Sequence, residues 1–212
     1  MSSVRPVSGT FSLHFAPYIA LVTEKDVLGA LEAQVPAVEG ALGGLSPQQG
    51  GFRYAEGKWT VGEVLGHVID AERVFGFRAL SAARGERADL PSFDENVYAA
   101  ASSHAGCPVG ELVEEFAALR RSHVLMFRHL DAAAWDRLGL VAGHPNAARS
   151  WAFVMVGHLR HHARVLTERY GVAVPADTYL GKVTVPATLK EACAVGAAAE
   201  KADVALYDRL LK

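Results

Sequence analysis

The sequence has few cysteines and little excess of charge of either sign. Its two cysteines, Cys107 and Cys193, form neither a CxxC pair nor a disulfide framework, which is typical of a reducing compartment. Lys and Arg number 21 against 23 Asp and Glu, for a formal net charge of −2. This near balance argues against a protein that mainly binds nucleic-acid phosphates, because such binding needs an excess of basic residues on one face. We therefore expect no nucleic-acid partner.

Long apolar runs are also lacking. The most apolar N-terminal stretch, residues 11–22, is interrupted by His14 and Pro17 and is too short to span a bilayer. No small-residue cleavage motif follows it cleanly. We expect a cytoplasmic protein with no membrane partner, in which this stretch covers the core.

Helical periodicity dominates the rest of the chain. Half of the 212 residues are hydrophobic and 21% are charged, as in a globular protein. Apolar residues recur at helical spacing in four long segments: 24–45, 60–84, 108–130 and 150–170. The pattern predicts an all-α fold, a four-helix bundle with an additional C-terminal helix.

Turn residues and caps indicate where these segments begin and end. Thr23 and Ser150 are candidate N-caps, and Thr60 with Glu63 fits a capping box. Gly171 is placed to end the fourth helix. Between the long helices we expect loops at 88–95 and 139–149 and short helices at 96–102 and 131–137.

We expect two parts in the chain. Residues 1–170 form the bundle with its N-terminal covering segment. Residues 171–212 form an extension, an irregular linker followed by one helix. That helix packs on the bundle or on a partner chain, which makes a homodimer plausible.

Three of the nine histidines stand out by position. His158 and His162 are four residues apart, so their rings stack on one face of a helix, within its apolar stripe. His67 occupies a similar inward position on the 60–84 helix. Three neutral imidazoles in a core are costly unless their nitrogens are satisfied, and one divalent metal satisfies all three. Three protein ligands leave a coordination position open, as in catalytic sites. The alternative is that each is a hydrogen-bonded core histidine.

Two better-known metal motifs do not match. Residues 158–162 lack the glutamate of the HExxH motif, so the general base of a metalloprotease is missing there. Neither His158 nor His162 has a glutamate three residues before it, which excludes the carboxylate-bridged di-iron design.

The order of these features resembles the DinB/YfiT-like family of metal-binding four-helix bundles. The matching segments are residues 58–67, 150–151 and 157–166, and the resemblance extends over roughly 24–170. In that family a W-[ST]-x-x-E-x-x-x-H segment supplies the first metal ligand and an HxxxH segment the other two. Position by position, the resemblance implies His67, His158 and His162 as ligands. The implied ion is divalent, zinc or nickel first, with iron or manganese as alternatives.

The resemblance implies two enzymatic functions, and a non-enzymatic one is the alternative to both. Some relatives transfer a low-molecular-weight thiol such as bacillithiol, mycothiol or glutathione to an electrophilic small molecule, through a metal-bound thiolate. Others are described as metal-dependent hydrolases, which use a metal-bound water. The third alternative is a non-enzymatic, stress-related metal-binding or interaction module. An open pocket beside the metal favours an enzyme, whereas a site plugged by side chains favours the module.

Three acidic residues are candidates to orient a ligand histidine or to act as a base. Asp70 lies about one helical turn after His67, and Asp94 and Glu95 lie in the predicted loop that follows the 60–84 helix. The alternative for each is a solvated carboxylate on the surface.

Three arginines are candidates to bind the carboxylates of a thiol cofactor. Arg78 falls on the inward side of its helix and is also a candidate catalytic residue, while Arg160 and Arg164 flank the histidine pair. The alternative is that they extend to water at one end of the bundle.

Overall fold

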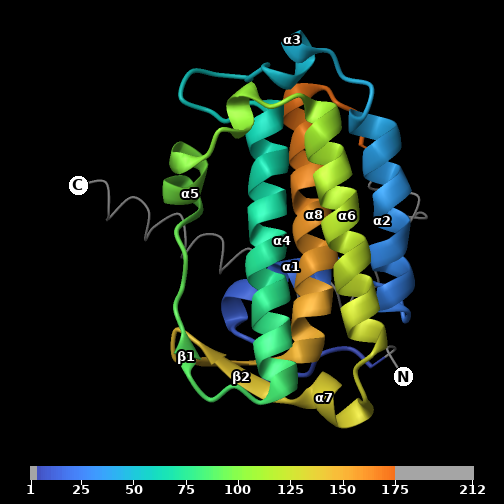
Figure 1. The fold of residues 1–212 in the computed structure, drawn as a ribbon, viewed down its shortest axis with the longest axis vertical. Coiled ribbons are helices and arrows are strands. Elements are labelled where there is room, and N and C mark those ends of the chain that lie inside the picture. Colours follow the sequence, from blue (N-terminus) through green and yellow to red (C-terminus); the bar gives the residue numbers. More distant parts are fainter. Residues whose placement is uncertain (1–3, 175–212) are drawn as a thin grey trace, which may run out of the picture. The chain divides into compact units, whose positions relative to one another are not determined.

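The computed structural model describes residues 4–174 of the chain (Figure 1). The predicted C-terminal helix and its packing lie outside these residues, so the two-part division and the homodimer stay predictions. None of the helices within residues 4–174 combines the length and the apolarity that crossing a membrane requires.

Four long helices run side by side and confirm the predicted all-α bundle (Figure 1). They are α2 (Val27–Leu42), α4 (Val61–Arg84), α6 (Val109–Arg128) and α8 (Ala148–Tyr170). Helix α4 packs against α8 and α6, and α2 packs against the same two helices. Consecutive helices α2 and α4 therefore lie diagonally across the bundle, a connection order that periodicity cannot predict.

Short elements close the two ends and one side of the bundle. They are η1 (Leu13–Phe15), α1 (Ala16–Ala20), α3 (Pro47–Gly50), α5 (Glu95–Ala101), η2 (His104–Gly106) and α7 (Ala132–Asp136). Helix α1 lies against α8 and contributes Ile19 to the core, next to Phe15 of η1.

The prediction of a loop at 139–149 is wrong, because most of these residues form a β-hairpin. Strand β2 (Leu138–Val141) pairs antiparallel with β3 (His144–Ala147), and β1 (Asp89–Leu90) adds to β2 in parallel. Ala142 and Gly143 between the strands have φ of 48° and 77°, the positive values that a two-residue type I′ turn needs. The sheet is small and leaves the fold class unchanged.

Helix caps match the sequence at two of the four predicted positions. Thr60 and Glu63 form the expected capping box at α4, and Gly171 ends α8 in the left-handed conformation. The cap prediction for Thr23 is wrong, because Asp26 accepts the hydrogen bond from Gly29 N at the start of α2.

The prediction that Ser150 caps the fourth helix is also wrong, because α8 begins at Ala148, two residues before Ser150. Ser150 lies inside the helix, where its hydroxyl donates to the carbonyl of Thr10. This bond fastens the N-terminal segment to the bundle.

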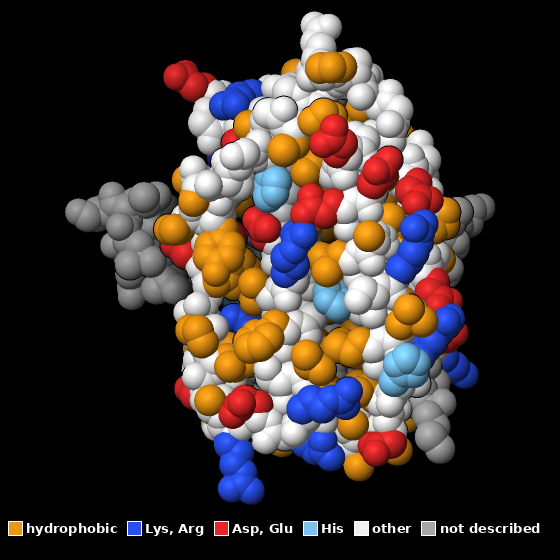
Figure 2. Space-filling view, in the orientation of Figure 1, with side chains coloured by type: hydrophobic (Ala, Val, Ile, Leu, Met, Phe, Trp, Pro, Cys, Tyr) orange, Lys and Arg blue, Asp and Glu red, His pale blue; other side chains and the backbone are white. Residues whose placement is uncertain are grey.

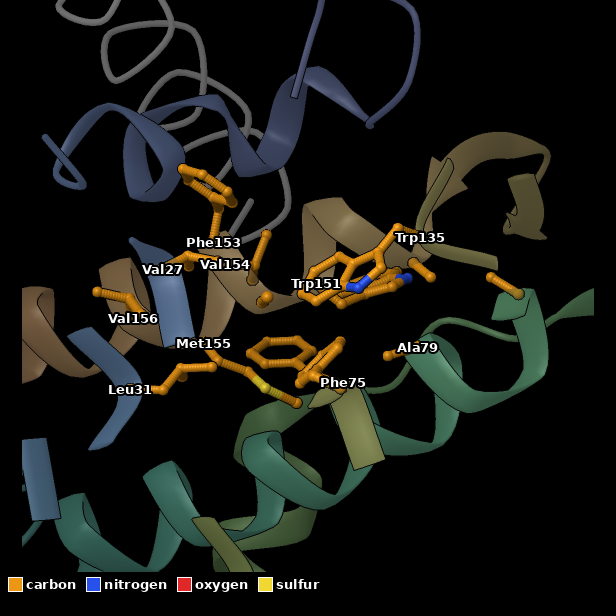
Figure 3. Close-up of a cluster of buried hydrophobic side chains, with 14 of the residues drawn as sticks. Val27, Leu31, Phe75, Ala79, Trp135, Trp151, Phe153, Val154, Met155 and Val156 are labelled. Carbon is orange, nitrogen blue, oxygen red and sulfur yellow. The ribbon is translucent and has the colours of Figure 1, made fainter. Parts of the chain in front are cut away.

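The apolar core is divided into two clusters, one in each half of the bundle. Figure 3 shows the first cluster, in which the rings of Phe75 and Trp151 stack 5.5 Å apart with Met155 beside them. The second cluster joins the N-terminal half of α4 to the C-terminal half of α8.

A buried polar group joins all four helices between these clusters. Arg120 of α6 is fully buried and donates to both oxygens of Glu72 on α4, at 2.6 and 2.9 Å. It also donates to Gln34 of α2, whose amide donates to the Val156 carbonyl of α8. Burial alone would raise the pKa of Glu72, but Arg120 and His123 hold this pKa below its usual value. These hydrogen bonds connect α2, α4, α6 and α8 at one level of the bundle.

On the outer face of α4, α6 and α2, acidic and basic side chains lie side by side (Figure 2). Three ion pairs connect neighbouring helices there: Arg73 with Glu115, Arg121 with Glu39, and Arg128 with Glu32. Exposed pairs of this kind each contribute little to stability.

Candidate metal centre

Three imidazoles meet at the contact between α4 and α8. His67 comes from α4, and His158 and His162 come from successive turns of α8. The Nε2 atom of His158 lies 3.1 Å from the Nε2 atom of His67 and 3.1 Å from that of His162. The ligand atoms of all three lie within 4.8 Å of one another. The structure thus brings together the three histidines that the sequence singled out.

Aromatic rings hold these imidazoles in place. The Trp59 ring lies 5.0 Å from the His67 ring, and the rings of Tyr18 and Phe75 meet the His158 ring edge to face. His67 and His158 are only 8% and 5% exposed. Packing therefore orients the imidazoles of His67 and His158, and the Nε2 atoms of His67 and His162 both approach the Nε2 atom of His158.

Burial keeps all three rings neutral at neutral pH. It lowers the pKa of His67 to about 4, with a contribution from His161. The pKa values of His158 and His162 lie well below the usual value, because of burial first and of the neighbouring imidazoles second. Neutral imidazole is the form that binds a metal.

The donor set fits a divalent transition metal. Nitrogen ligands about 2.1 Å from one ion, at tetrahedral or octahedral angles, lie roughly 3.0–3.4 Å apart. The two Nε2 separations of 3.1 Å fall in this range. Among the described residues, this is the one group of three His, Cys, Asp or Glu side chains close enough to share an ion.

A cavity of about 530 Å³ opens beside the three imidazoles, all of which line it. Its apolar wall is aromatic and comes from four parts of the chain: Phe15, Tyr18, Trp59, Phe75 and Phe93. Further histidines line it as well, His14, His144 and His161. The site is therefore open to a small molecule and is not plugged by side chains.

Two of the other predicted candidates reach this cavity. Arg78 of α4 and Glu95, the first residue of α5, are both part of its lining. Asp94 does not line it, because its carboxylate caps α5 by accepting from the backbone N of Asn96 and Val97.

Asp70 does not line the cavity either. It lies in another hollow of the surface, 3.9 Å from His104 and 3.8 Å from Arg73. Although Asp70 is only about one helical turn after His67, its side chain faces η2 and not the imidazoles.

The two arginines beside the histidine pair are also absent from the cavity lining. Arg160 pairs with Glu24 and donates to the carbonyl of Leu21, so it fastens the N-terminal segment to α8. Arg164 is exposed to solvent. Of the three candidate arginines, the structure brings only Arg78 to the cavity.

Several lining residues carried no sequence signal of a site. Tyr18 and His14 belong to the N-terminal segment, and His144 belongs to the hairpin that was expected to be a loop. Their place in the cavity depends on tertiary contacts, and no spacing rule links them to the histidine motif. Trp59 is the exception, since it belongs to the motif that ends at His67.

Comparison with known proteins supports the same fold. The solved structure of YfiT from Bacillus subtilis matches with a TM-score of 0.59, covering 80% of this chain and 94% of that one at 17% sequence identity. YfiT is described as a probable metal-dependent hydrolase with an unusual four-helix bundle topology. No curated protein matches the chain. A family model described as the DinB superfamily matches residues 30–166. The resemblance noted in the sequence is confirmed, and the chain belongs to the DinB superfamily.

Proposed function

We propose that the protein is a metal-dependent enzyme that transfers a low-molecular-weight thiol, of the bacillithiol type, to an electrophilic small molecule. The observation that carries the proposal is the open, aromatic-walled cavity beside three converging Nε2 atoms. His67, His158 and His162 would hold the ion, with zinc or nickel as the first candidates. When bound, such an ion supplies an open coordination position at which a thiol or a water loses its proton more readily.

The side chains of the cavity suit a substitution reaction on a small apolar molecule. The aromatic wall excludes water from the electrophile and holds it beside the imidazoles. In the reaction, a bond forms between the thiol sulfur and an electrophilic carbon while the bond from that carbon to a leaving halide breaks. The thiol proton passes to solvent, and no oxidant or reductant is needed.

Hydrolysis is the second candidate, and one observation favours it. Glu95 contributes a carboxylate to the cavity lining, where it would accept the proton of an attacking water. The printed description of YfiT as a probable metal-dependent hydrolase is consistent with this alternative. The open cavity supports either enzyme over the non-enzymatic module.

A two-part assay tests the proposal and separates the alternatives. Protein loaded with zinc or with nickel is incubated with bacillithiol, mycothiol or glutathione and 1-chloro-2,4-dinitrobenzene, and the thioether is followed by its absorbance. A parallel reaction offers p-nitrophenyl esters without thiol. We expect thiol-dependent turnover that a chelator and His158→Ala both abolish. Turnover of esters alone would favour the hydrolase, and no turnover with any thiol would refute the transferase.

The proposal also implies a location. Low-molecular-weight thiols are kept reduced in the cytoplasm, so a transferase that uses them is expected to work there.

A further inference from the structure

Arg78 lies at a distance from the imidazoles but on the same side of α4. At 3.6 residues per turn, the eleven residues from His67 to Arg78 make about three turns, so both face the same way, roughly 16 Å apart along the axis. Both residues line the one cavity. The cavity therefore extends along α4 from the histidines to a guanidinium group.

Arg78 is buried and sits between two aromatic rings. It is 5% exposed, and its Cζ lies 5.4 Å from the Trp151 ring and 5.6 Å from the Phe93 ring. Its Nη2 donates to the carbonyl of Pro91 at 2.8 Å. Among residues 4–174, this carbonyl is the only hydrogen-bond acceptor that the guanidinium finds. Most of its five N–H donors therefore remain available to a ligand in the cavity.

The other buried arginines of the described chain differ from Arg78 in one respect. Each pairs with a carboxylate: Arg120 with Glu72, Arg149 with Asp136 and Arg160 with Glu24. Within the same described residues, no carboxylate lies within 4.0 Å of Arg78. Glu95 lines the same cavity but forms no ion pair with it.

Burying a cation without a counter-charge is unfavourable, because the charged form loses its hydration. Burial lowers the pKa of Arg78 below its usual value, with only Tyr98 acting in the opposite direction. A carboxylate that entered the cavity would supply the missing charge and accept from the free edge of the planar guanidinium in a bidentate pair.

We propose that Arg78 is an anion subsite that binds a carboxylate of the ligand at the end of the cavity opposite the three histidines. The inference rests on the proposed function for the role of the histidine end. It defines the ligand class as an elongated small molecule with a thiol or other metal-binding group at one end. The carboxylate is at the other end, and the part between them contacts the aromatic wall.

An NMR titration with two matched probes tests the subsite without any need for turnover. Phenylacetate and phenylacetamide have the same shape and differ in charge. They are titrated into the full-length, zinc-loaded protein and into variants. Because hydrogen bonds to charged groups are the strong ones, we expect phenylacetate to bind about tenfold or more tightly than the amide. Arg78→Met should remove this preference, and Arg78→Lys should keep only part of it.

The matched control is Arg73→Met, on the same helix with the same loss of charge. Its side chain is half exposed, pairs with Glu115 and does not line the cavity. This variant should keep the wild-type preference. A metal-free His162→Ala variant should also keep it, because the carboxylate binds at Arg78 and not at the metal.

Three results would overturn the proposal: equal binding of the two probes to the wild type, an unchanged preference in Arg78→Met, or loss of the preference in His162→Ala. Should Arg78→Met fail to fold, the Nε–H signal of Arg78 in the wild type gives the same answer. The chemical shift of that signal should change when phenylacetate is added and should not change when phenylacetamide is added. A preference that depends on Arg78 in a protein without thiol turnover would leave the subsite standing and refute only the transferase.

Discussion

Replacing Gly157 with alanine should loosen the covering of the metal centre. Gly157 precedes His158 on α8, at the point where α1 crosses it. A Cβ added at Gly157 would lie 1.9 Å from the carbonyl oxygen of Tyr18 and 2.4 Å from its carbonyl carbon. Both are backbone atoms, so the clash cannot be relieved by turning a side chain. Helix α1 would have to move away from α8 by about 1.5 Å to restore an ordinary contact near 3.4 Å.

The magnitude follows from two opposing effects. Overpacking of a well-packed contact costs about 1–3 kcal/mol, and α1 cannot move freely because Arg5 and Arg160 bind carbonyls at its C-terminal end. Alanine in place of glycine inside a helix recovers at most about 1 kcal/mol. We expect a net loss of about 1–2 kcal/mol, which lowers Tm by about 2–8 °C in a domain of this size.

Thermal denaturation followed by circular dichroism measures this loss. Gly40→Ala is the matched control, because Gly40 is an exposed glycine inside α2 with no atom within 4 Å of an added Cβ. That variant should be as stable as the wild type or more stable. A Gly157→Ala protein with an unchanged or raised Tm would refute the reasoning that only glycine lets α1 approach α8 here.

Three further predictions concern the core and the site. Glu72→Gln should cost about 3–5 kcal/mol in urea denaturation, because Arg120 would stay buried without its counter-charge; adding Arg120→Met should recover most of the loss. Since the pKa of Glu72 is lowered in the folded state, its contribution is present above the unfolded value near 4.5 and is lost as the pH falls through the folded value. The stability gap between wild type and Glu72→Gln should therefore shrink in acid, and a gap that does not change with pH would contradict this assignment. Tyr170→Phe should cost about 1 kcal/mol by removing the hydrogen bond to the Trp59 carbonyl. The Trp59 ring, which packs on His67, should become more mobile, as measured by NMR relaxation of its own indole N–H signal.

Helical spacing and caps were sufficient to predict the bundle and its four long helices. The capping box at Thr60 and the glycine at 171 act locally, so their effect is visible in the sequence itself. The diagonal placement of α2 and α4 was not predictable, because helical periodicity identifies the apolar face of a helix and not the neighbour that covers it. The hairpin at β2 and β3 was missed because its strands are only four residues long.

For the site as well, the features that depend on local sequence were predictable and those that depend on tertiary contacts were not. The i, i+4 spacing of His158 and His162 is a local property, and the motif ending at His67 pointed to the third imidazole. The partners of Arg78 and Arg160 could not be predicted, because Trp151 and Glu24 reach them only in the folded chain. The sequence offered all three arginines as candidates to bind a carboxylate, and only the tertiary contacts show that Arg78 lines the cavity whereas Arg160 pairs with Glu24.

Zinc and nickel binding measured by elemental analysis and calorimetry tests the central claim most directly. The proteins compared are the wild type, single alanine variants of His67, His158 and His162, and His129→Ala as a control at an exposed histidine of the bundle. The account predicts one tightly bound divalent ion per chain in the wild type and the control, and strongly reduced metal content in each of the other three. Equal metal content in all five proteins would contradict it.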